Sequence, residues 1–309
     1  MATEPSLAVQ IGSLTLRNPV MTASGCFGWG EAFRRFFDLN ELGALVGKAV
    51  TPEPRAGNPD LRIWETPAGM LNAIGLQNPG VEGFIADILP GLRDLICPII
   101  ANVPAHSIEG YVHVARRLTE AGGIAAIELN LSCPNVGRDG KEFCVEPESV
   151  AEVVGAVRAV TPLPLIAKLS PNVTDIVPLA QAAEAAGADA LSLINTLVGM
   201  SIDVERRRPM LGNVTGGLSG PAIRPIALRM VYEVAGAVRI PVIGIGGIAT
   251  TRDALEFLMA GATAIQVGTA NFFNPRACPE IIAGLRRWLT EHGIADVRAL
   301  IGAARRPEG

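Results

Sequence analysis

The sequence predicts an α/β protein built as a (β/α)8 barrel, with a small N-terminal β-hairpin and long active-site loops at the strand C-termini. Short apolar or β-branched runs alternate with amphipathic helical stretches eight times. No G-x-G-x-x-G follows the first strand, which favours a closed barrel over the main alternative, a doubly wound sheet. Since one barrel fills about 250 residues or more, we expect residues 1–309 to form a single domain.

The elements follow one another regularly along the chain. The hairpin is expected in AVQIGSLTLRNPV, at the bottom of the barrel. Strands are expected at 20–24, 44–50, 98–103, 125–131, 164–169, 190–194, 241–246 and 264–268. Helices are expected at 107–121, 147–160, 173–186, 222–235, 251–260 and 279–292. Ala-Gly-Ala steps before two of the strands are typical of helix C-caps. The long interruptions 51–95, 132–146 and 195–221 all follow strand C-termini, where barrel enzymes place active-site loops.

Composition and charge exclude several classes of protein. Hydrophobic residues make up 49% of the chain and charged residues 18%, which suits a globular enzyme with a large core. A net charge of −4 leaves no basic footprint for nucleic acid, and the arginines at 206–208 are too few to track a phosphate backbone. No signal sequence and no apolar run of about 18 residues is found. We therefore expect a soluble chain without membrane contact.

The cysteines indicate a reducing compartment. They are odd in number and never form a C-x-x-C pair, so neither a disulfide framework nor a zinc or iron-sulfur site is expected. Cytoplasmic localisation fits best. The five are Cys26, Cys97, Cys133, Cys144 and Cys278.

Polar or small residues stand at or just past every predicted strand end. Lysines and amides are rarely buried without partners, and here they converge on the face where barrel enzymes carry out catalysis. Any one of them alone could be a satisfied structural group, but together they indicate an active site. They are Ser24, Lys48, Asn102, Asn130, Lys168, Asn195, Gly246, Gly247, Gly268 and Thr269.

The last two strands indicate a phosphorylated ligand. They end in GIGGIATTRDAL and IQVGTANFF, which place small residues directly before a helix. Lys168 and Lys48 would then face the middle of the barrel mouth, where a cation stabilises negative charge on a ring or a carboxylate. A lysine that forms a Schiff base, as in barrel aldolases, is the competing interpretation of the same residues.

The stretch IELNLSCPNV ends a strand in a thiol between polar residues. Cys133 follows Ser132 at the catalytic end of that strand, and a thiolate there can serve as nucleophile or general base. Cys97 and Cys278, in apolar or helix-start contexts, are interpreted as buried structural thiols.

Nearly the whole chain resembles dihydroorotate dehydrogenase, through motifs that occur in the same order. They are ASGCFGWG, GKAVTPEPRAGNP, NAIGLQNPG, ELNLSCPNV, KLSPNVTDI, INT, GGLSG, GIGGI and VGTA. The chain is most similar to the soluble class 1B catalytic subunit, because cysteine rather than serine occupies the base position. The resemblance implies an FMN flavoprotein of the cytoplasm, an oxidoreductase of de novo pyrimidine biosynthesis that oxidises dihydroorotate to orotate.

The resemblance also implies residue roles. Cys133 would be the general base, with Lys48 and Lys168 as the other catalytic residues, and no metal is implied. FMN would be lined by Ser24, Lys48, Ala49, Asn102, Asn130, Lys168, Ile194, Gly220, Gly246, Gly247, Gly268 and Thr269. Substrate would be held by Lys48, Asn72, Ala73, Ile74, Gly75, Leu76, Asn130, Asn195 and Thr196.

The resemblance further implies a partner. Class 1B enzymes pass electrons to NAD through a second subunit with FAD and a [2Fe-2S] cluster, in a heterotetramer around a homodimer core. A class 1A homodimer that uses fumarate is an alternative, as is a catalytic domain like that of dihydropyrimidine dehydrogenase. A third alternative comes from a different class: a non-redox phosphate-binding aldolase or isomerase that uses Lys168.

Overall fold

Eight parallel strands form the barrel in this computed structural model, which describes residues 4–132 and 145–305. Their order around the sheet is β3-β16-β15-β10-β9-β8-β7-β4. All eight run in the same direction, so their carboxyl ends meet at one end of the barrel. The strands are β3 (Val20–Thr22), β4 (Leu45–Ala49), β7 (Ile99–Val103), β8 (Ala126–Asn130), β9 (Leu165–Lys168), β10 (Ala190–Leu193), β15 (Val242–Ile245) and β16 (Ala264–Val267).

The first and last strands of this order approach each other and close the barrel. Met21 and Ala44 form a parallel bridge, and the Thr22 hydroxyl both donates to the Val46 carbonyl (3.0 Å) and accepts from the Val46 N–H (2.9 Å). The predicted (β/α)8 barrel is therefore confirmed.

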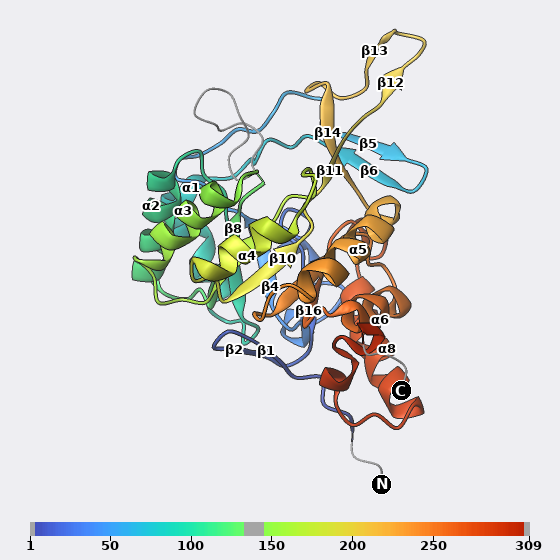
Figure 1. Ribbon diagram of the computed structural model, residues 1–309. Helices are drawn as coiled ribbons and strands as arrows, with labels where there is room; N and C mark the ends of the chain where they lie inside the picture. The colour runs from blue at the N-terminus through green and yellow to red at the C-terminus, as the bar shows by residue number, and fades with distance from the viewer. Residues whose placement is uncertain (1–3, 133–144, 306–309) are drawn as a thin grey trace.

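Helices surround the barrel (Figure 1). Each predicted helix is present, with ends that differ by a few residues. The helix α6 begins with a capping box, in which Thr250 and Asp253 bond to each other's backbone N–H groups. Two four-residue helices, α1 and α7, were not predicted. The α-helices are α1 (Gly80–Gly83), α2 (Ile108–Ala121), α3 (Pro147–Arg158), α4 (Val177–Ala185), α5 (Arg224–Ala235), α6 (Thr251–Ala260), α7 (Ala270–Phe273) and α8 (Ala277–Glu291).

The predicted hairpin consists of β1 (Val9–Ile11) and β2 (Leu14–Leu16). Ile11 and Leu16 are completely buried. The turn residue Gly12 lies against Asp189, directly before β10, so closely that a Cβ on Gly12 would approach the Asp189 Cβ to 2.9 Å. The hairpin therefore covers the amino-terminal end of the strands, opposite the expected site (Figure 1).

Two of the expected loops contain a second, antiparallel sheet over the carboxyl-terminal end of the barrel (Figure 1). Its order is β11-β14-β6-β5, and it has a small core of its own formed by Leu71, Ala73 and Leu211. A two-residue ladder, β12 with β13, extends beyond it. The strands are β5 (Ile63–Thr66), β6 (Gly69–Asn72), β11 (Leu197–Met200), β12 (Ile202–Asp203), β13 (Arg208–Pro209) and β14 (Thr215–Ser219).

Several single turns connect these elements. They are the 3-10 turns Glu31–Phe33, Leu39–Glu41, Leu89–Leu92, Pro221–Ile223, Val297–Leu300 and Ala303–Arg305, and the π-helical turn Phe84–Ile88. Within residues 4–132 and 145–305, no helix combines the length and the apolar character needed to cross a membrane.

Candidate active site

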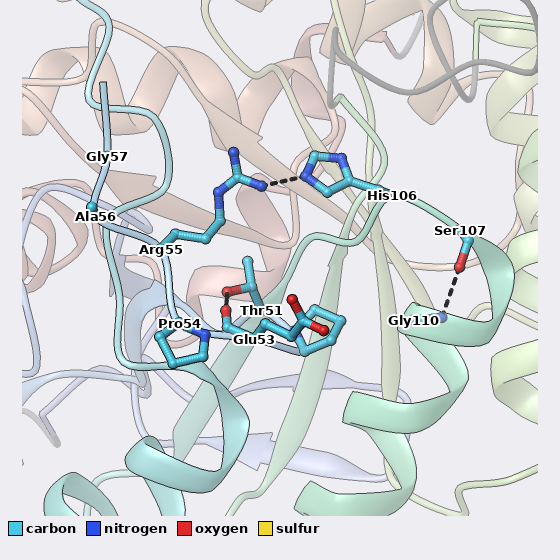
Figure 2. A pocket seen from close by; sticks show the side chains of 10 residues that line it. Thr51, Glu53, Pro54, Arg55, Ala56, Gly57, His106, Ser107 and Gly110 are labelled. Carbon is cyan, nitrogen blue, oxygen red and sulfur yellow. Dashed lines mark hydrogen bonds between the residues drawn. The ribbon is translucent and has the colours of Figure 1, made fainter. Parts of the chain in front are cut away.

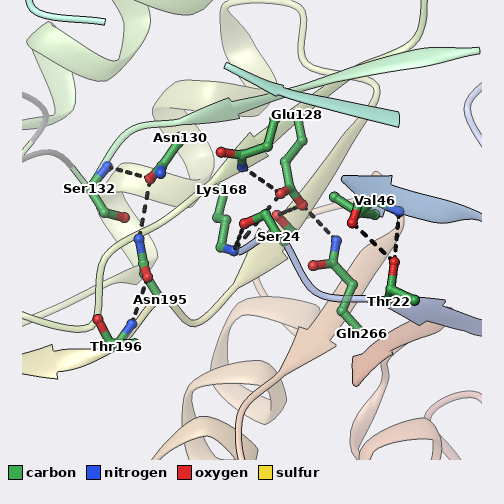
Figure 3. Close-up of polar contacts among 12 residues, drawn as sticks. Thr22, Ser24, Val46, Glu128, Asn130, Ser132, Lys168, Asn195, Thr196 and Gln266 are labelled. Atoms are coloured by element: carbon green, nitrogen blue, oxygen red, sulfur yellow. Dashed lines mark hydrogen bonds and ion pairs between the residues drawn. The ribbon is translucent and has the colours of Figure 1, made fainter. Parts of the chain in front are cut away.

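The barrel brings together strand-end residues that lie far apart in the sequence. Lys168, the last residue of β9, donates from Nζ to Ser24 Oγ across 3.1 Å. Asn195, just past β10, donates from Nδ2 to Asn130 Oδ1 across 3.2 Å. Figure 3 shows both contacts at the ends of their strands. The predicted convergence of polar side chains is thus present in the fold.

Lys168 is only 4% exposed and lies over a buried carboxylate. Its Nζ is 3.8 Å from Glu128 Oε1, and Glu128 is completely buried. The Lys168 Nζ therefore already has two protein partners, Ser24 Oγ and Glu128 Oε1.

Glu128 accepts hydrogen bonds from three further side chains inside the barrel. Asn102 Nδ2 donates to Oε1 (2.8 Å), while Ser192 Oγ (2.9 Å) and Gln266 Nε2 (2.6 Å) donate to Oε2. We call Asn102, Glu128, Lys168, Ser192 and Gln266 the buried polar layer. Sequence reasoning missed three of its members, Glu128, Ser192 and Gln266. A signal was present, because Glu128 lies two residues before Asn130 and so faces the same side of the strand.

Asn130 is fixed from several directions. The Tyr111 hydroxyl donates to its backbone carbonyl across 2.8 Å. Its Oδ1 accepts from the Ser132 N–H (3.4 Å) as well as from Asn195, whose own Oδ1 accepts from the Thr196 N–H (2.8 Å). Two adjacent amides with fixed orientations can read the N–H and C=O edges of a small heterocycle.

Lys48 reaches the same end from β4 but has a different environment. It is half-buried, and within the described part of the chain it makes no hydrogen bond to another predicted site residue. Burial lowers its pKa, the Cys26 thiol raises it, and Arg62 lowers it further. The lysine is therefore a donor without a fixed protein partner, suited to an anionic ligand group.

Cys26 lies close to both lysines, and sequence reasoning gave it no role. Burial raises its pKa to about 11, against the opposing effect of Lys168 and Lys48. A Cβ added to Gly268 would lie 3.4 Å from its Sγ. Burial raises the pKa of Cys26 more than the two neighbouring lysines lower it. We therefore interpret Cys26 as a protonated thiol that packs at the barrel end.

The expected substrate run follows β6, in the second sheet. Its carbonyls are held by neighbours: Asn58 Nδ2 donates to Ala73 O (3.1 Å) and Arg55 Nε donates to Gly75 O (3.4 Å). Gly75 and Leu76 both have positive φ, of 78° and 58°. β6 pairs with β14, and Thr196 occupies the space where Gly217 of β14 has no side chain. The run from Asn72 to Leu76 is thereby linked to Asn195 and Thr196.

Two of the four residues predicted to hold a phosphate, Gly247 and Thr269, line a small pocket at the ends of β15 and β16. We call it the glycine pocket; its lining comprises Gly220, Pro221, Gly247, Ile248, Ala249, Thr269, Ala270 and Phe273. Gly247 has a φ of 72°, and a Cβ there would lie 2.6 Å from the Arg224 Cβ and 2.9 Å from the Gly220 carbonyl oxygen. Only glycine fits this position.

Asp253, another residue missed in the sequence, fixes the loop beside this pocket. It is 3% exposed, and its Oδ2 accepts from the N–H groups of Ala249 (3.0 Å) and Thr250 (2.9 Å). Its Oδ1 contacts Arg224 Nη1. The backbone of the pocket wall is therefore held in place before any ligand arrives.

The remaining predicted residues lie at strand ends. Ala49 and Ile194 are buried, and the Ile194 N–H is already bonded to the Ile245 carbonyl (3.0 Å). Gly246 has a φ of 127°, beyond the reach of most side chains. Cys133, the predicted base, and Cys144 lie outside the described residues. Among residues 4–132 and 145–305, no three His, Cys, Asp or Glu side chains form a potential metal site.

A larger pocket, of about 510 Å³, lies between the loop after β4 and the start of α2 (Figure 2). Arg55 Nη1 contacts His106 Nε2 there. Burial lowers the pKa of His106, and Arg55 lowers it further. None of the predicted site residues lines this pocket, although Arg55 connects it to Gly75. Its lining residues are Thr51, Pro52, Glu53, Pro54, Arg55, Ala56, Gly57, His106, Ser107 and Gly110.

The family model for dihydroorotate dehydrogenase matches residues 6–289. Three similar proteins carry the name "Dihydroorotate dehydrogenase B (NAD(+)), catalytic subunit". The protein from Trichlorobacter lovleyi is 60% identical over 97% of this chain and 99% of its own length. The proteins from Desulforudis audaxviator (58%; 98% of both chains) and Geobacter sulfurreducens (56%; 97% of this chain, 98% of its own) are similar to nearly the same extent.

The environment of Cys26 predicts slow alkylation. With its pKa raised from 9.0 to about 11, the thiolate fraction at pH 8 is about a hundredfold smaller than in the unfolded chain. Iodoacetamide labelling at pH 8, followed by peptide mass spectrometry, should show Cys26 modified about a hundredfold more slowly in the folded chain than in concentrated urea. The native rate should rise as the pH approaches 11. Equal rates with and without urea would contradict the assignment.

Proposed function

Because the chain belongs to the dihydroorotate dehydrogenase family, we propose that it oxidises dihydroorotate to orotate as the catalytic subunit of the NAD-linked B-type enzyme. The single observation that carries this proposal is 60% identity over 97% of the chain to a protein named as that subunit. The lysines and amides at the carboxyl ends of the strands support it, since they suit a small anionic heterocycle. We further propose that residues 1–309 act as one barrel domain.

The residues at the barrel mouth fit FMN. The glycine pocket, lined by Gly220, Gly247 and Thr269, would hold the phosphate group through backbone N–H groups. Lys168, with the amides of Asn102 and Asn130, would line the isoalloxazine ring. The full proposed set is Ser24, Lys48, Ala49, Asn102, Asn130, Lys168, Ile194, Gly220, Gly246, Gly247, Gly268 and Thr269. FMN, when bound, supplies the two-electron acceptor of the reaction.

The chain's own residues would hold the substrate and move its proton. Lys48 would bind the substrate carboxylate, because its ammonium has no fixed partner among the described residues. Asn130 and Asn195, with Asn72 to Leu76 and Thr196, would read the ring edges. Cys133 stands two residues after Leu131 in the sequence. Its thiolate would take the proton from C5 of the substrate. Lys168 would place a fixed positive charge beneath the ring.

The partner is proposed as a second subunit that carries FAD and a [2Fe-2S] cluster, in a cytoplasmic heterotetramer around a dimer of this chain. The words "catalytic subunit" and "NAD(+)" in the relatives' names support a partner. Exposed apolar side chains on the second sheet and its extension support contact with another chain. They are Leu61, Ile63, Trp64, Val198, Met200, Ile202, Val204 and Val214.

The glycine pocket predicts the effect of one substitution. Gly247→Val should yield folded protein that binds FMN at least about tenfold more weakly, because its Cβ would collide with the Arg224 Cβ and the Gly220 carbonyl oxygen and so displace the wall of the pocket. Gly155→Val is the control. Gly155 lies on α3, and a Cβ added there would meet no atom outside its own helix within 4 Å. Flavin absorbance and circular dichroism of both variants give the answer. Normal flavin content in folded Gly247→Val would show that the phosphate is held elsewhere.

The proposed base gives a second prediction. Cys133→Ala should bind FMN and orotate but lose about 10²-fold or more in turnover, the usual contribution of a general base. Cys133→Ser should keep a little activity with its pH optimum moved upward, since a hydroxyl is a much weaker acid than a thiol. Steady-state rates across pH with an artificial dye as electron acceptor measure both effects. An alanine variant with full activity would remove the thiol from the mechanism.

The route of the electrons tests the proposed function directly. The purified chain should oxidise dihydroorotate with artificial dyes, yet form NADH only slowly until the FAD and [2Fe-2S] subunit is added. Anaerobic stopped-flow mixing with dihydroorotate and NAD, with and without that subunit, measures this difference. Rapid NADH formation by the single chain would contradict the two-subunit proposal, and rapid fumarate reduction would move the assignment to class 1A.

A further inference from the structure

Glu128 is a buried ionisable group for which the proposed mechanism has no use. It lies in the middle of β8, two residues before Asn130, and its side chain has no exposed surface. A carboxylate in the interior of a barrel costs several kcal/mol of desolvation unless its partners compensate. Its neighbours therefore show what it does.

All four neighbours that reach the carboxylate can donate. Asn102 and Lys168 face Oε1, at 2.8 Å and 3.8 Å. Ser192 and Gln266 face Oε2, at 2.9 Å and 2.6 Å. An ionised carboxylate accepts only, so it matches this set, whereas a glutamine amide would set an N–H group against at least one of these donors.

Lys168 depends on this carboxylate for its charge balance. Apart from Glu128 its ammonium contacts Ser24 Oγ, which is neutral. Within the part of the chain that the structure describes, Glu128 is the only carboxylate within 4.0 Å of Lys168 Nζ. Removing one partner of a buried pair leaves the other as an uncompensated charge, which then either loses its proton or moves toward water.

We propose that Glu128 is a positioning residue for the cofactor site. It holds the Lys168 Nζ in place, directed at Ser24 (Figure 3). It also fixes the orientation of the Asn102 and Gln266 amides. Each donates from its nitrogen to the carboxylate, so its oxygen points away from Glu128. The link to FMN rests on the proposed function, whereas the link between Glu128 and Lys168 does not.

The chain offers a direct test, because it contains three lysines, Lys48, Lys141 and Lys168. With ¹⁵N-lysine labelling and no FMN, the wild-type spectrum should contain one ammonium signal protected from exchange with water. Its loss in Lys168→Arg assigns it. In Glu128→Gln the protection should fall by about tenfold or more, or the signal should vanish. Ser192→Ala is the matched control: it removes one donor, leaves the carboxylate in place and should keep the signal.

An unchanged Lys168 signal in Glu128→Gln would overturn the proposal. If that variant does not fold, Glu128→Asp takes its place: the carboxylate retreats by one methylene, so exchange at Lys168 should quicken, and an unchanged rate would contradict the proposal equally. FMN affinity is the second measurement. Glu128→Gln should bind FMN about tenfold more weakly, with partial recovery in Glu128→Asp. Failure of the wild type itself to bind FMN would contradict the proposed function and leave the lysine result standing.

Discussion

The arrangement of side chains at the barrel mouth depends on the buried contact between the Lys168 Nζ and the Glu128 carboxylate. A barrel of eight strands has an interior just wide enough for its own side chains, so polar groups inside it depend on partners from neighbouring strands. Here an acid from β8 takes donors from β7, β9, β10 and β16. Five strands are thereby connected below the mouth, and Lys168 gains a fixed position that a surface lysine lacks.

The groups that a ligand could contact at the barrel mouth lie above this buried polar layer. On one side, Asn130 and Asn195 bond to each other and leave groups for a ligand. On another, the ends of β15 and β16 form the glycine pocket, whose loop is fixed by Asp253. The second sheet adds the run after β6 and joins it to Thr196. The proposed cofactor and substrate would thus be held by rigid strands below and by the second sheet above.

The barrel and the convergence of polar side chains at its carboxyl-terminal end were predictable, because strand and helix alternate with clear periods and because lysines and amides at strand ends are uncommon. The partners of Glu128 could not be predicted. Ser192 lies 64 residues from Glu128 in the chain and Gln266 lies 138 residues from it, and no pattern within a single strand indicates that either one contacts Glu128. The second sheet was missed for the same reason, since Asn72 of β6 meets Gly217 of β14 across 145 residues. The role of Cys133 stays a prediction, because it lies outside the described residues.

Anaerobic addition of dihydroorotate to the FMN-loaded chain, followed by visible absorbance, tests the central claim most directly. The account predicts that the chain binds FMN, that each equivalent of dihydroorotate bleaches one equivalent of flavin, and that an equal amount of orotate appears. A colourless chain that refuses FMN, or a bound flavin whose spectrum dihydroorotate leaves unchanged, would contradict the account.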